Sequence, residues 1–244
     1  VQIAPTAPAT GTWLKCDGAT YLQSSYAALF SQLGPIGNSP GSISTPIQRA
    51  LPGPLNWTSV AYGNGIFVAV ASGSASITTS TDGITWTAQS GVMPSSSAWG
   101  SVAFGNGVFV AVTSGGTANA ATSTDGITWT ARTLPVSAYW NVAFGGGTFV
   151  AIGTSSSTAS ATSPDGITWT QRTIPASAWE SVTYGNGTFV AVAYNTAIAA
   201  TSPDGITWTQ KTLPSAPWRA VCFGNGLFAL LSFGSSVAAS AYAG

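Results

Sequence analysis

A motif that returns five times at nearly constant spacing constrains the fold of this 244-residue chain more than any other feature. The first copy runs from Trp57 to Val70. The first glycine of the motif is Gly63, Gly105, Gly145, Gly185 and Gly224 in the five copies, with spacings of 42, 40, 40 and 39 residues. A period of about 40 without helical spacing is typical of a β-propeller blade, a four-stranded antiparallel sheet set radially around a channel. We therefore predict an all-β fold, a five-bladed β-propeller over residues 43–244.

Each repeat divides into four strands at its own turn residues. In the first repeat, the sequence predicts strands over residues 60–62, 66–71, 76–80 and 84–89. Gly63-Asn64-Gly65 predicts a tight hairpin after the first strand, and Asp82-Gly83 predicts a turn before the fourth. A proline follows each fourth strand, where we expect it to end the pairing and begin the crossing to the next blade: Pro94, Pro135, Pro175 and Pro214.

A second motif, Ser80-Thr-Asp82-Gly-Ile-Thr-Trp86, occurs four times. It resembles the Asp-box of sialidase-type propellers, although each copy is one residue shorter between the aspartate and the glycine. In that family the box is a structural turn between strands three and four. The resemblance implies that the aspartates bind backbone amides of the turn, namely Asp82, Asp125, Asp165 and Asp204. It also implies that the motif tryptophans pack between blades, namely Trp86, Trp129, Trp169 and Trp208.

The fifth repeat ends before a fourth strand is complete. An upstream segment, Thr45 to Pro52, aligns with Thr207 to Pro214 of the fourth repeat, and both lead into a motif tryptophan. We therefore predict that residues 43–52 form the fourth strand of the last blade, which joins the two chain ends and removes an open sheet edge.

The N-terminal part carries a second resemblance. The run Gly11-Thr-Trp13-Leu-Lys-Cys16-Asp17-Gly18 is followed by Tyr26-Ala-Ala-Leu29-Phe30 and Gly34. This pattern, over about residues 8–38, resembles the phage tail collar domain. It predicts a small module with one short helix over residues 1–42, linker included. The resemblance implies a distal tail-fibre component that touches the bacterial surface.

Charge and cysteine content exclude several classes of protein. Only 5% of residues are charged, with six basic and six acidic side chains. No basic cluster could neutralise a run of phosphates, so we expect neither nucleic acid as a partner nor membrane insertion. Two cysteines are too few for a zinc site, and Cys16 and Cys222 are either small buried apolar residues or one disulfide.

The residues for catalysis are nearly absent. The chain has no histidine, and five of its six acidic residues are Asp17 and the four turn aspartates. Glu180 is then the one propeller carboxylate outside the turn motif, whereas glycoside hydrolysis normally needs two carboxylates. Four cations, Arg49, Arg132, Arg172 and Lys211, occupy equivalent outer-strand positions and are expected to face solvent. We predict a protein that is not an enzyme and uses no cofactor or metal.

The repeats differ most at one position, two residues before the strand-one valine. It reads Thr58, Gly100, Trp140, Glu180 and Arg219. Strand one lines the channel of a propeller, so these residues should ring one mouth of it, next to the preceding aromatic residues Trp57, Trp99, Tyr139, Trp179 and Trp218. Aromatic rings with a few polar groups suit sugars. The alternatives are that the aromatic residues only pack blades together and that Glu180 and Arg219 form a weak surface pair.

These features predict a receptor-binding protein of a phage tail fibre or tail tip, located in the virion and in contact with the host cell surface. Its partner would be a host cell-surface carbohydrate such as lipopolysaccharide, beside other phage tail or fibre proteins, with trimerisation through the parent fibre left open. One alternative is a structural cap or spacer that docks other tail proteins. Another is a polysaccharide depolymerase.

Overall fold

The structure is a computed structural model. It describes residues 2–3, 14–15, 49–90, 92–95, 97–113, 120–136, 139–153, 157–194, 196–233 and 238–242. The chain divides into two units, Val1–Gln48 and Arg49–Gly244. In the first unit, β1 (Gln2–Ile3) and β2 (Leu14–Lys15) form an antiparallel pair. The predicted collar-like module with its helix and Cys16 otherwise falls outside the described residues.

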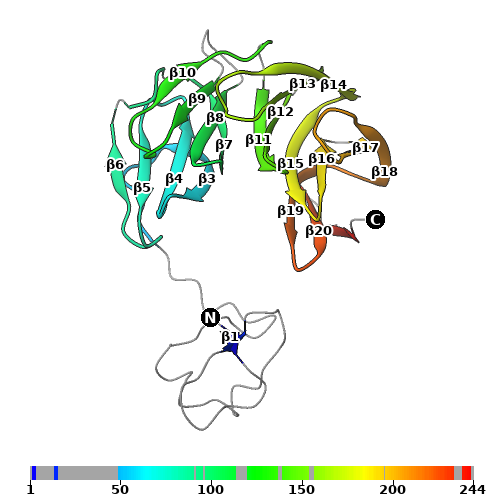
Figure 1. Ribbon diagram of the computed structural model, residues 1–244, viewed down its shortest axis with the longest axis horizontal. Coiled ribbons are helices and arrows are strands. Elements are labelled where there is room, and N and C mark those ends of the chain that lie inside the picture. Colours follow the sequence, from blue (N-terminus) through cyan, green and yellow to red (C-terminus); the bar gives the residue numbers. More distant parts are fainter. Residues whose placement is uncertain are drawn as a thin grey trace. The chain divides into compact units, whose positions relative to one another are not determined.

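The second unit contains five antiparallel sheets, one for each repeat (Figure 1). Their strands are β3 (Asn56–Gly63), β4 (Ile66–Ser72), β5 (Ile77–Ser80) and β6 (Thr87–Gln89); β7 (Trp99–Gly105), β8 (Val108–Thr113), β9 (Ala120–Ser123) and β10 (Thr130–Arg132); β11 (Tyr139–Gly145), β12 (Thr148–Gly153), β13 (Ser157–Ser163) and β14 (Thr170–Ser177); β15 (Trp179–Gly185), β16 (Thr188–Ala193), β17 (Thr196–Ser202) and β18 (Thr209–Ala216); β19 (Trp218–Gly224), β20 (Leu227–Ser232) and β21 (Ala238–Tyr242).

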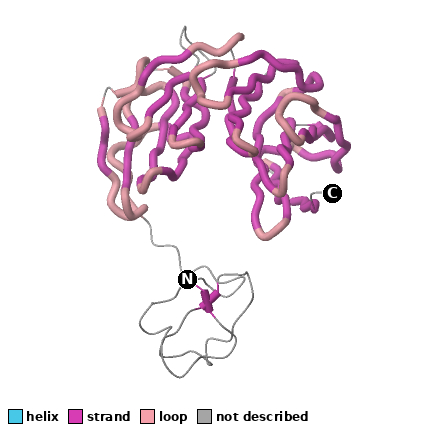
Figure 2. Tube along the Cα trace, viewed as in Figure 1, coloured by secondary structure: helices cyan, strands magenta, loops and turns pink. Residues whose placement is uncertain are grey.

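The first strands of successive sheets pack against one another, in the order β3, β7, β11, β15 and β19. Within each sheet the later strands follow in chain order toward the outside. This arrangement confirms the predicted all-β, five-bladed propeller. The described residues form strands and loops only (Figure 2), and none of them belongs to a helix able to cross a membrane.

The predicted hairpins agree with the structure, and β3 extends the predicted strand one, residues 60–62, to Asn56–Gly63. Two other predictions differ from the structure. Asn64 and Gly65 have φ angles of 48° and 82°, as a tight hairpin after strand one requires. Strand four, however, begins at Thr87 and not at Ile84, because the amides of Ile84 and Thr85 bind the turn aspartate instead of a neighbouring strand.

The prolines give a second difference. Pro175 and Pro214 lie inside β14 and β18, so they do not follow the fourth strand as predicted. Both fall within irregular stretches of strand pairing, between Thr173 and Ser177 and between Thr212 and Ala216. A residue without an N–H is tolerated at such a bulge.

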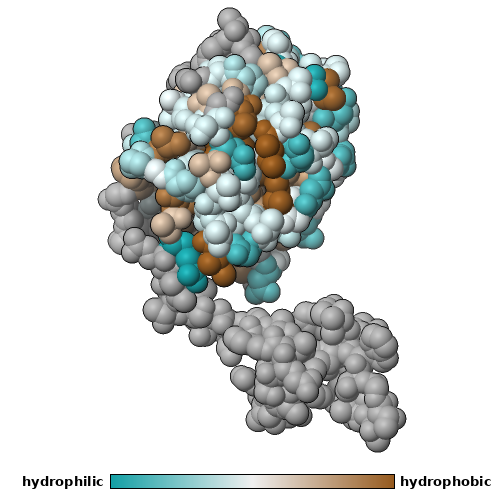
Figure 3. Space-filling view, turned by 90° about the vertical axis from the view of Figure 1, so that its left-hand side faces the viewer, coloured by the Kyte–Doolittle hydropathy of each residue, from teal (hydrophilic) through white to brown (hydrophobic). Residues whose placement is uncertain are grey.

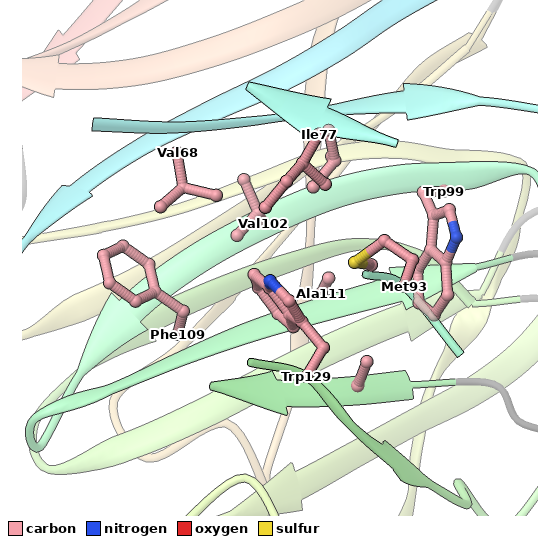
Figure 4. Packing of buried hydrophobic residues seen from close by; sticks show 10 residues of the cluster. Val68, Ile77, Met93, Trp99, Val102, Phe109, Ala111 and Trp129 are labelled. Carbon is pink, nitrogen blue, oxygen red and sulfur yellow. The ribbon is translucent and has the colours of Figure 1, made fainter. Parts of the chain in front are cut away.

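Four hydrophobic clusters, one at each joint between neighbouring blades, form the core. At the first joint (Figure 4), Val68 and Ile77 of blade one meet Val102, Phe109 and Trp129 of blade two. The core of the described propeller is therefore a series of equivalent joints and not one central cluster.

At each of the four described joints, the glycine that ends the inner strand makes room for an aromatic ring of the next blade. A Cβ at Gly63 would lie 2.1 Å from Cγ of Phe104, and one at Gly185 would lie 2.0 Å from Cγ of Phe223. Gly105 and Gly145 stand in the same relation to Phe144 and Tyr184. The regular recurrence of this glycine in the sequence therefore reflects packing at the joint as well as the hairpin.

A hydrogen bond also crosses each joint. The Oγ of Ser59 accepts a bond from the amide of Val102 at 3.1 Å, and the Oγ of Ser181 accepts one from Val221 at 3.2 Å. Ser101 and Asn141 accept equivalent bonds from the amides of Val142 and Val182. The fifth blade has Ala220 at this position, and alanine cannot accept such a bond.

The first and last blades each leave one face uncovered by other described strands. Val60 and Tyr62 of the first blade are 57% exposed, whereas Val102, Val142 and Val182 are at most 6% exposed. On the last blade, Leu231 is 57% exposed, and no described atom lies within 4 Å of a Cβ placed at Gly224. Figure 3, which looks at the molecule from the left of Figure 1, shows apolar residues in separate groups on that side.

Two further predictions concern this end of the propeller. Cys222 carries a free, exposed thiol, so the expectation of a buried residue is wrong; it lies on the uncovered face of β19. The predicted closing strand is described only from Arg49 to Pro52, where no strand is present. The last sheet contains β19, β20 and β21 among the described residues, and residues 43–48 lie outside them, so the closing strand stays a prediction.

Candidate functional site

The turn aspartates have the structural role that the sequence predicts. Oδ1 of Asp82 accepts hydrogen bonds from the amides of Ile84 and Thr85, both at 2.8 Å. The same pair of bonds is made by Asp125, Asp165 and Asp204. A serine two residues earlier donates its hydroxyl to the same oxygen, at 2.9 Å for Ser80. The four carboxylates are therefore occupied within their own turns.

These hydrogen bonds also determine the charge of the turns. The amide of Thr85, followed by that of Ile84, lowers the pKa of Asp82 from 3.8 to about 2. At Asp125, burial acts to raise the pKa, but the amides of Thr128 and Ile127 outweigh it and the pKa again falls to about 2. Carboxyls with so low a pKa are poor general acids near neutral pH.

The aromatic residues that precede the variable positions lie in the joints. Trp99, Tyr139, Trp179 and Trp218 are all 0% exposed. Three of them donate their indole N–H to the carbonyl four residues earlier, on Ser95, Pro175 and Pro214. Burial raises the pKa of Tyr139 to about 12. The structure thus favours blade packing for these four, and a ligand in solvent does not reach them.

Three of the five variable positions make contacts between neighbouring blades. Thr58 donates its hydroxyl to the carbonyl of Trp99 at 2.7 Å, which links blades one and two. A Cβ at Gly100 would come within 2.5 Å of the Trp140 carbonyl oxygen and 2.8 Å of its ring. The half-buried Trp140 ring therefore leans on blade two, while Glu180 lies on blade four.

The other two variable positions meet. Nη1 of Arg219 lies 2.7 Å from Oε1 of Glu180, and the two side chains are 53% and 15% exposed. The guanidinium carbon of Arg219 also lies 5.9 Å from the ring centroids of both Tyr194 and Phe233. We call Glu180, Tyr194, Arg219 and Phe233 the Arg219 cluster. It joins the inner strands of blades four and five to the residues that follow β16 and β20.

Strand pairing explains why these four residues converge. Trp179 pairs with Ala193 and Trp218 pairs with Ser232, and the register shifts directly after each tryptophan. Glu180 and Arg219 are therefore the extra residues of two equivalent bulges, next to the strand exits at Tyr194 and Phe233. The amides of Tyr194 and Phe233 donate to Ala178 and Pro217, both at 2.8 Å, which fixes the two aromatic residues in equivalent places.

The sequence predicted Tyr194 as part of a second variable surface and missed Phe233. A signal for both was present, because the residue at this strand exit reads Ser72, Ser114, Thr154, Tyr194 and Phe233. At this strand exit, an aromatic residue therefore occurs only in the two blades that carry Glu180 and Arg219.

Burial also acts on the acid of the cluster. It raises the pKa of Glu180 above its usual value, and the positive charge of Arg219 only partly offsets this effect. The outer-strand cations lie elsewhere: Nε of Arg132 and of Arg172 donate to Thr122 and Thr162, so these two are half-buried and do not simply face solvent as expected. Arg219 is then the one cation among the described residues with an ion pair.

The described residues contain no group of three or more potential metal ligands. The Arg219 cluster instead combines two exposed aromatic residues, Tyr194 and Phe233, with a guanidinium that is ion-paired to Glu180. Such an arrangement can bind a ligand by stacking and hydrogen bonding.

No family model and no curated protein matches this chain. Solved structures do resemble it. The virginiamycin B lyase of Staphylococcus aureus, solved as a catalytically inactive histidine-to-alanine variant with quinupristin, has a TM-score of 0.65 at 15% identity, over 78% of this chain and 71% of the lyase. A streptogramin B lyase has a TM-score of 0.60 at 10% identity, over 77% and 68% of the two chains.

A chain of a nidogen and laminin complex is similar as well. Its TM-score is 0.59 at 12% identity, over 77% of this chain and 76% of that one. The likeness is one of fold alone. It supports the β-propeller, while the resemblances to the phage tail collar and to the Asp-box rest on the sequence motifs.

Proposed function

We propose that the propeller binds a bacterial surface glycan, with lipopolysaccharide as the leading class, and that the chain is a receptor-binding protein of a phage tail fibre or tail tip. The N-terminal resemblance supports the location in a virion. The observation that carries the binding proposal is the Arg219 cluster, in which Phe233 is 63% and Tyr194 is 37% exposed beside an ion-paired arginine. Exposed rings of this kind can stack on the C–H faces of sugars.

The cluster lies on two adjacent blades and so does not depend on closure of the ring. Blades four and five share a buried joint that includes Val192, Trp218 and Val221. The position of Arg219 relative to Glu180 is therefore set by that joint alone, and the proposed site needs no channel mouth.

A binding role is favoured over catalysis. The lyase of similar fold is inactive when one of its histidines is replaced by alanine, and this chain contains no histidine. The four turn carboxylates are held by backbone amides, which leaves Glu180 as the carboxylate in the cluster. Release of reducing ends from a host polysaccharide would instead favour the depolymerase alternative.

Binding of the full chain to an array of bacterial surface polysaccharides tests the proposal. We expect retention of at least one polysaccharide and loss of that binding in Arg219→Ala at an unchanged melting temperature. Arg172→Ala is the matched control, because Arg172 lies on β14, the outer strand of blade three, where its side chain donates a hydrogen bond to Thr162. Binding to no glycan and to no host cell would favour the structural cap or spacer.

We also propose that the segment of residues 43–52 completes the last blade, with its strand before Arg49, since no strand is present from Arg49 to Pro52. The described sheet of that blade stops at β21, and no described strand pairs with its outer edge. An added strand there would bring the chain ends into one sheet and cover an edge that otherwise invites pairing with other chains.

A further inference from the structure

The Arg219 guanidinium has donors to spare. Its contact with Glu180 uses Nη1, and a guanidinium carries five N–H donors in a planar fork. About half of the arginine side chain is exposed, at 53%. An acceptor from solvent can therefore reach the remaining donors without displacing Glu180.

The neighbours of Arg219 hold the guanidinium in a defined place. Glu180, 15% exposed, anchors it from the preceding blade, and the rings of Tyr194 and Phe233 lie 5.9 Å from its central carbon. An arginine fixed in this way loses little side-chain entropy when a ligand binds. The arrangement resembles a prepared anion-binding group more than a mobile surface cation.

Charged side chains at the variable position and aromatic side chains at the strand exit occur together only on blades four and five. Three of the five blades carry Thr58, Gly100 and Trp140 at the variable position and small hydroxyl residues at the strand exit. Blades four and five are the two that carry a charged residue at the variable position and an aromatic residue at the strand exit. A weak surface pair alone would not require two aromatic residues at the matching strand exits.

We propose that the Arg219 cluster selects acidic sugars, whose carboxylate or phosphate binds the free edge of Arg219 while the sugar ring packs on Phe233 or Tyr194. This inference rests on the proposed glycan-binding function and names the class of glycan. Arginine binds planar carboxylates and phosphates through two parallel N–H bonds, which are stronger than bonds between neutral groups. A neutral sugar gains only stacking and uncharged hydrogen bonds at the same place.

An array of matched saccharide pairs tests the inference on the full chain. Each pair contains a neutral oligosaccharide and the same backbone as a uronic acid or as a sugar phosphate. We expect at least about tenfold tighter binding of the acidic member, and a fall in that preference with rising salt. The uronic acid and phosphate arms tell which anion the site takes.

Two variants locate the effect. Arg219→Gln keeps size and hydrogen bonding but removes the charge, and we expect it to abolish the acidic preference while the protein melts at the same temperature. Arg219→Lys should lose most of the preference, because a lysine cannot form the two parallel bonds. Arg172→Gln, which alters a cation bonded to Thr162 on an outer strand, should leave it unchanged.

The outcomes separate the two proposals. Equal binding of acidic and neutral members, or an acidic preference that survives Arg219→Gln, would overturn the acidic-sugar inference and leave glycan binding standing. Absence of binding to every saccharide and to host polysaccharide would overturn both.

Discussion

Gly100 is the residue that gives the Trp140 ring its place. An added Cβ would come within 2.5 Å of a backbone oxygen, which cannot move as easily as the end of a side chain. We therefore predict that Gly100→Ala lowers the free energy of unfolding by about 1 to 3 kcal/mol, measured by urea denaturation. Sugar binding at the Arg219 cluster should persist in the folded variant, since the cluster lies on other blades. A variant as stable as the parent would contradict the packing of Trp140 on Gly100.

Substitution of Trp140 tells whether the proposed binding surface includes blade three or is limited to blades four and five. The sequence grouped it with Glu180 and Arg219, because all three occupy one variable repeat position. In the structure, Glu180 and Arg219 form an ion pair, whereas the Trp140 ring packs on Gly100 of blade two. We expect Trp140→Ala to weaken glycan binding less than Arg219→Ala, as measured by titration calorimetry. Equal losses would extend the site to blade three.

The residues of the site were only partly predictable for a physical reason. Repeat comparison finds positions that differ, and it found Glu180, Arg219 and Tyr194. It gives no information on which variable side chains touch, since that depends on rotamers and strand ends. Tyr194 and Phe233 both lie one residue beyond strand two, but Tyr194 was predicted only as part of a variable loop and Phe233 was not predicted.

At the scale of the element, the Asp turn makes stability depend on pH. The pKa of Asp82 and of Asp125 falls from 3.8 to about 2, and that of Asp165 and Asp204 is also lowered. A carboxyl with a depressed folded pKa stabilises the fold above its unfolded pKa and loses that effect as the pH falls through the folded value. We predict that the melting temperature falls steeply between about pH 4 and pH 2.

Asp125→Asn provides the matched variant for this effect. An asparagine oxygen can still accept the amides of Ile127 and Thr128, but it does not titrate. The melting temperature of this variant should depend less on pH below pH 4, with proton uptake on unfolding reduced by about one. An unchanged pH profile would show that the turn aspartates are not the groups responsible. Glu180, with its raised pKa, acts in the opposite direction and belongs to one blade only.

The hydrogen bond across each joint gives a second prediction for the element. Ser181→Ala removes the acceptor for the buried amide of Val221 and should cost about 1 to 3 kcal/mol of unfolding free energy, measured by urea denaturation. Ser215→Ala, at an exposed position of β18, is the control and should be neutral. An equally small effect of both would show that the Val221 amide finds another partner.

Strand order and the hairpins followed from the sequence because glycine, asparagine and aspartate mark turns with specific backbone needs. Asn64 at a φ of 48° is one such position. The start of strand four did not follow, since the aspartate captures two amides that would otherwise continue the strand. The position of Pro214 inside β18 depends on a bulge, which the residue pattern does not reveal.

At the scale of the whole molecule, the first and last blades each carry one of the two groups that form a joint elsewhere, although the described residues form no joint between these two blades. Gly224 has open space where Gly185 holds the Phe223 ring, and Tyr62 is 57% exposed where its counterparts pack on a glycine. If the ring closes as we propose, Tyr62 would take the place over Gly224. We then predict that Gly224→Ala destabilises the protein by about 1 to 3 kcal/mol, as measured by urea denaturation.

Gly185→Ala is the reference variant for that measurement, because a Cβ at Gly185 would meet the Phe223 ring whether or not the ring of blades is closed. Tyr62→Ala should also destabilise the protein if the ring is closed, whereas an exposed tyrosine costs little on removal. Neutral effects of both Gly224→Ala and Tyr62→Ala, beside a costly Gly185→Ala, would mean that the first and last blades stay apart.

The number of blades could be predicted from the sequence, since each one carries its own copy of the motif. Closure of the ring stays a prediction, because it depends on the rotation between neighbouring blades and on residues 43–48, which lie outside the described residues. A closing joint would differ from the other four, since the fifth blade has Ala220 where the other blades have a serine or an asparagine.

Because each described joint uses a glycine and an aromatic ring at the same two positions, a blade carries on its two faces the groups needed to pack between two others. Duplication or loss of one 40-residue unit would leave the same kind of contact at each remaining joint. If the Arg219 cluster binds a ligand as proposed, exchange of its two blades for another pair would change that ligand without changing the fold.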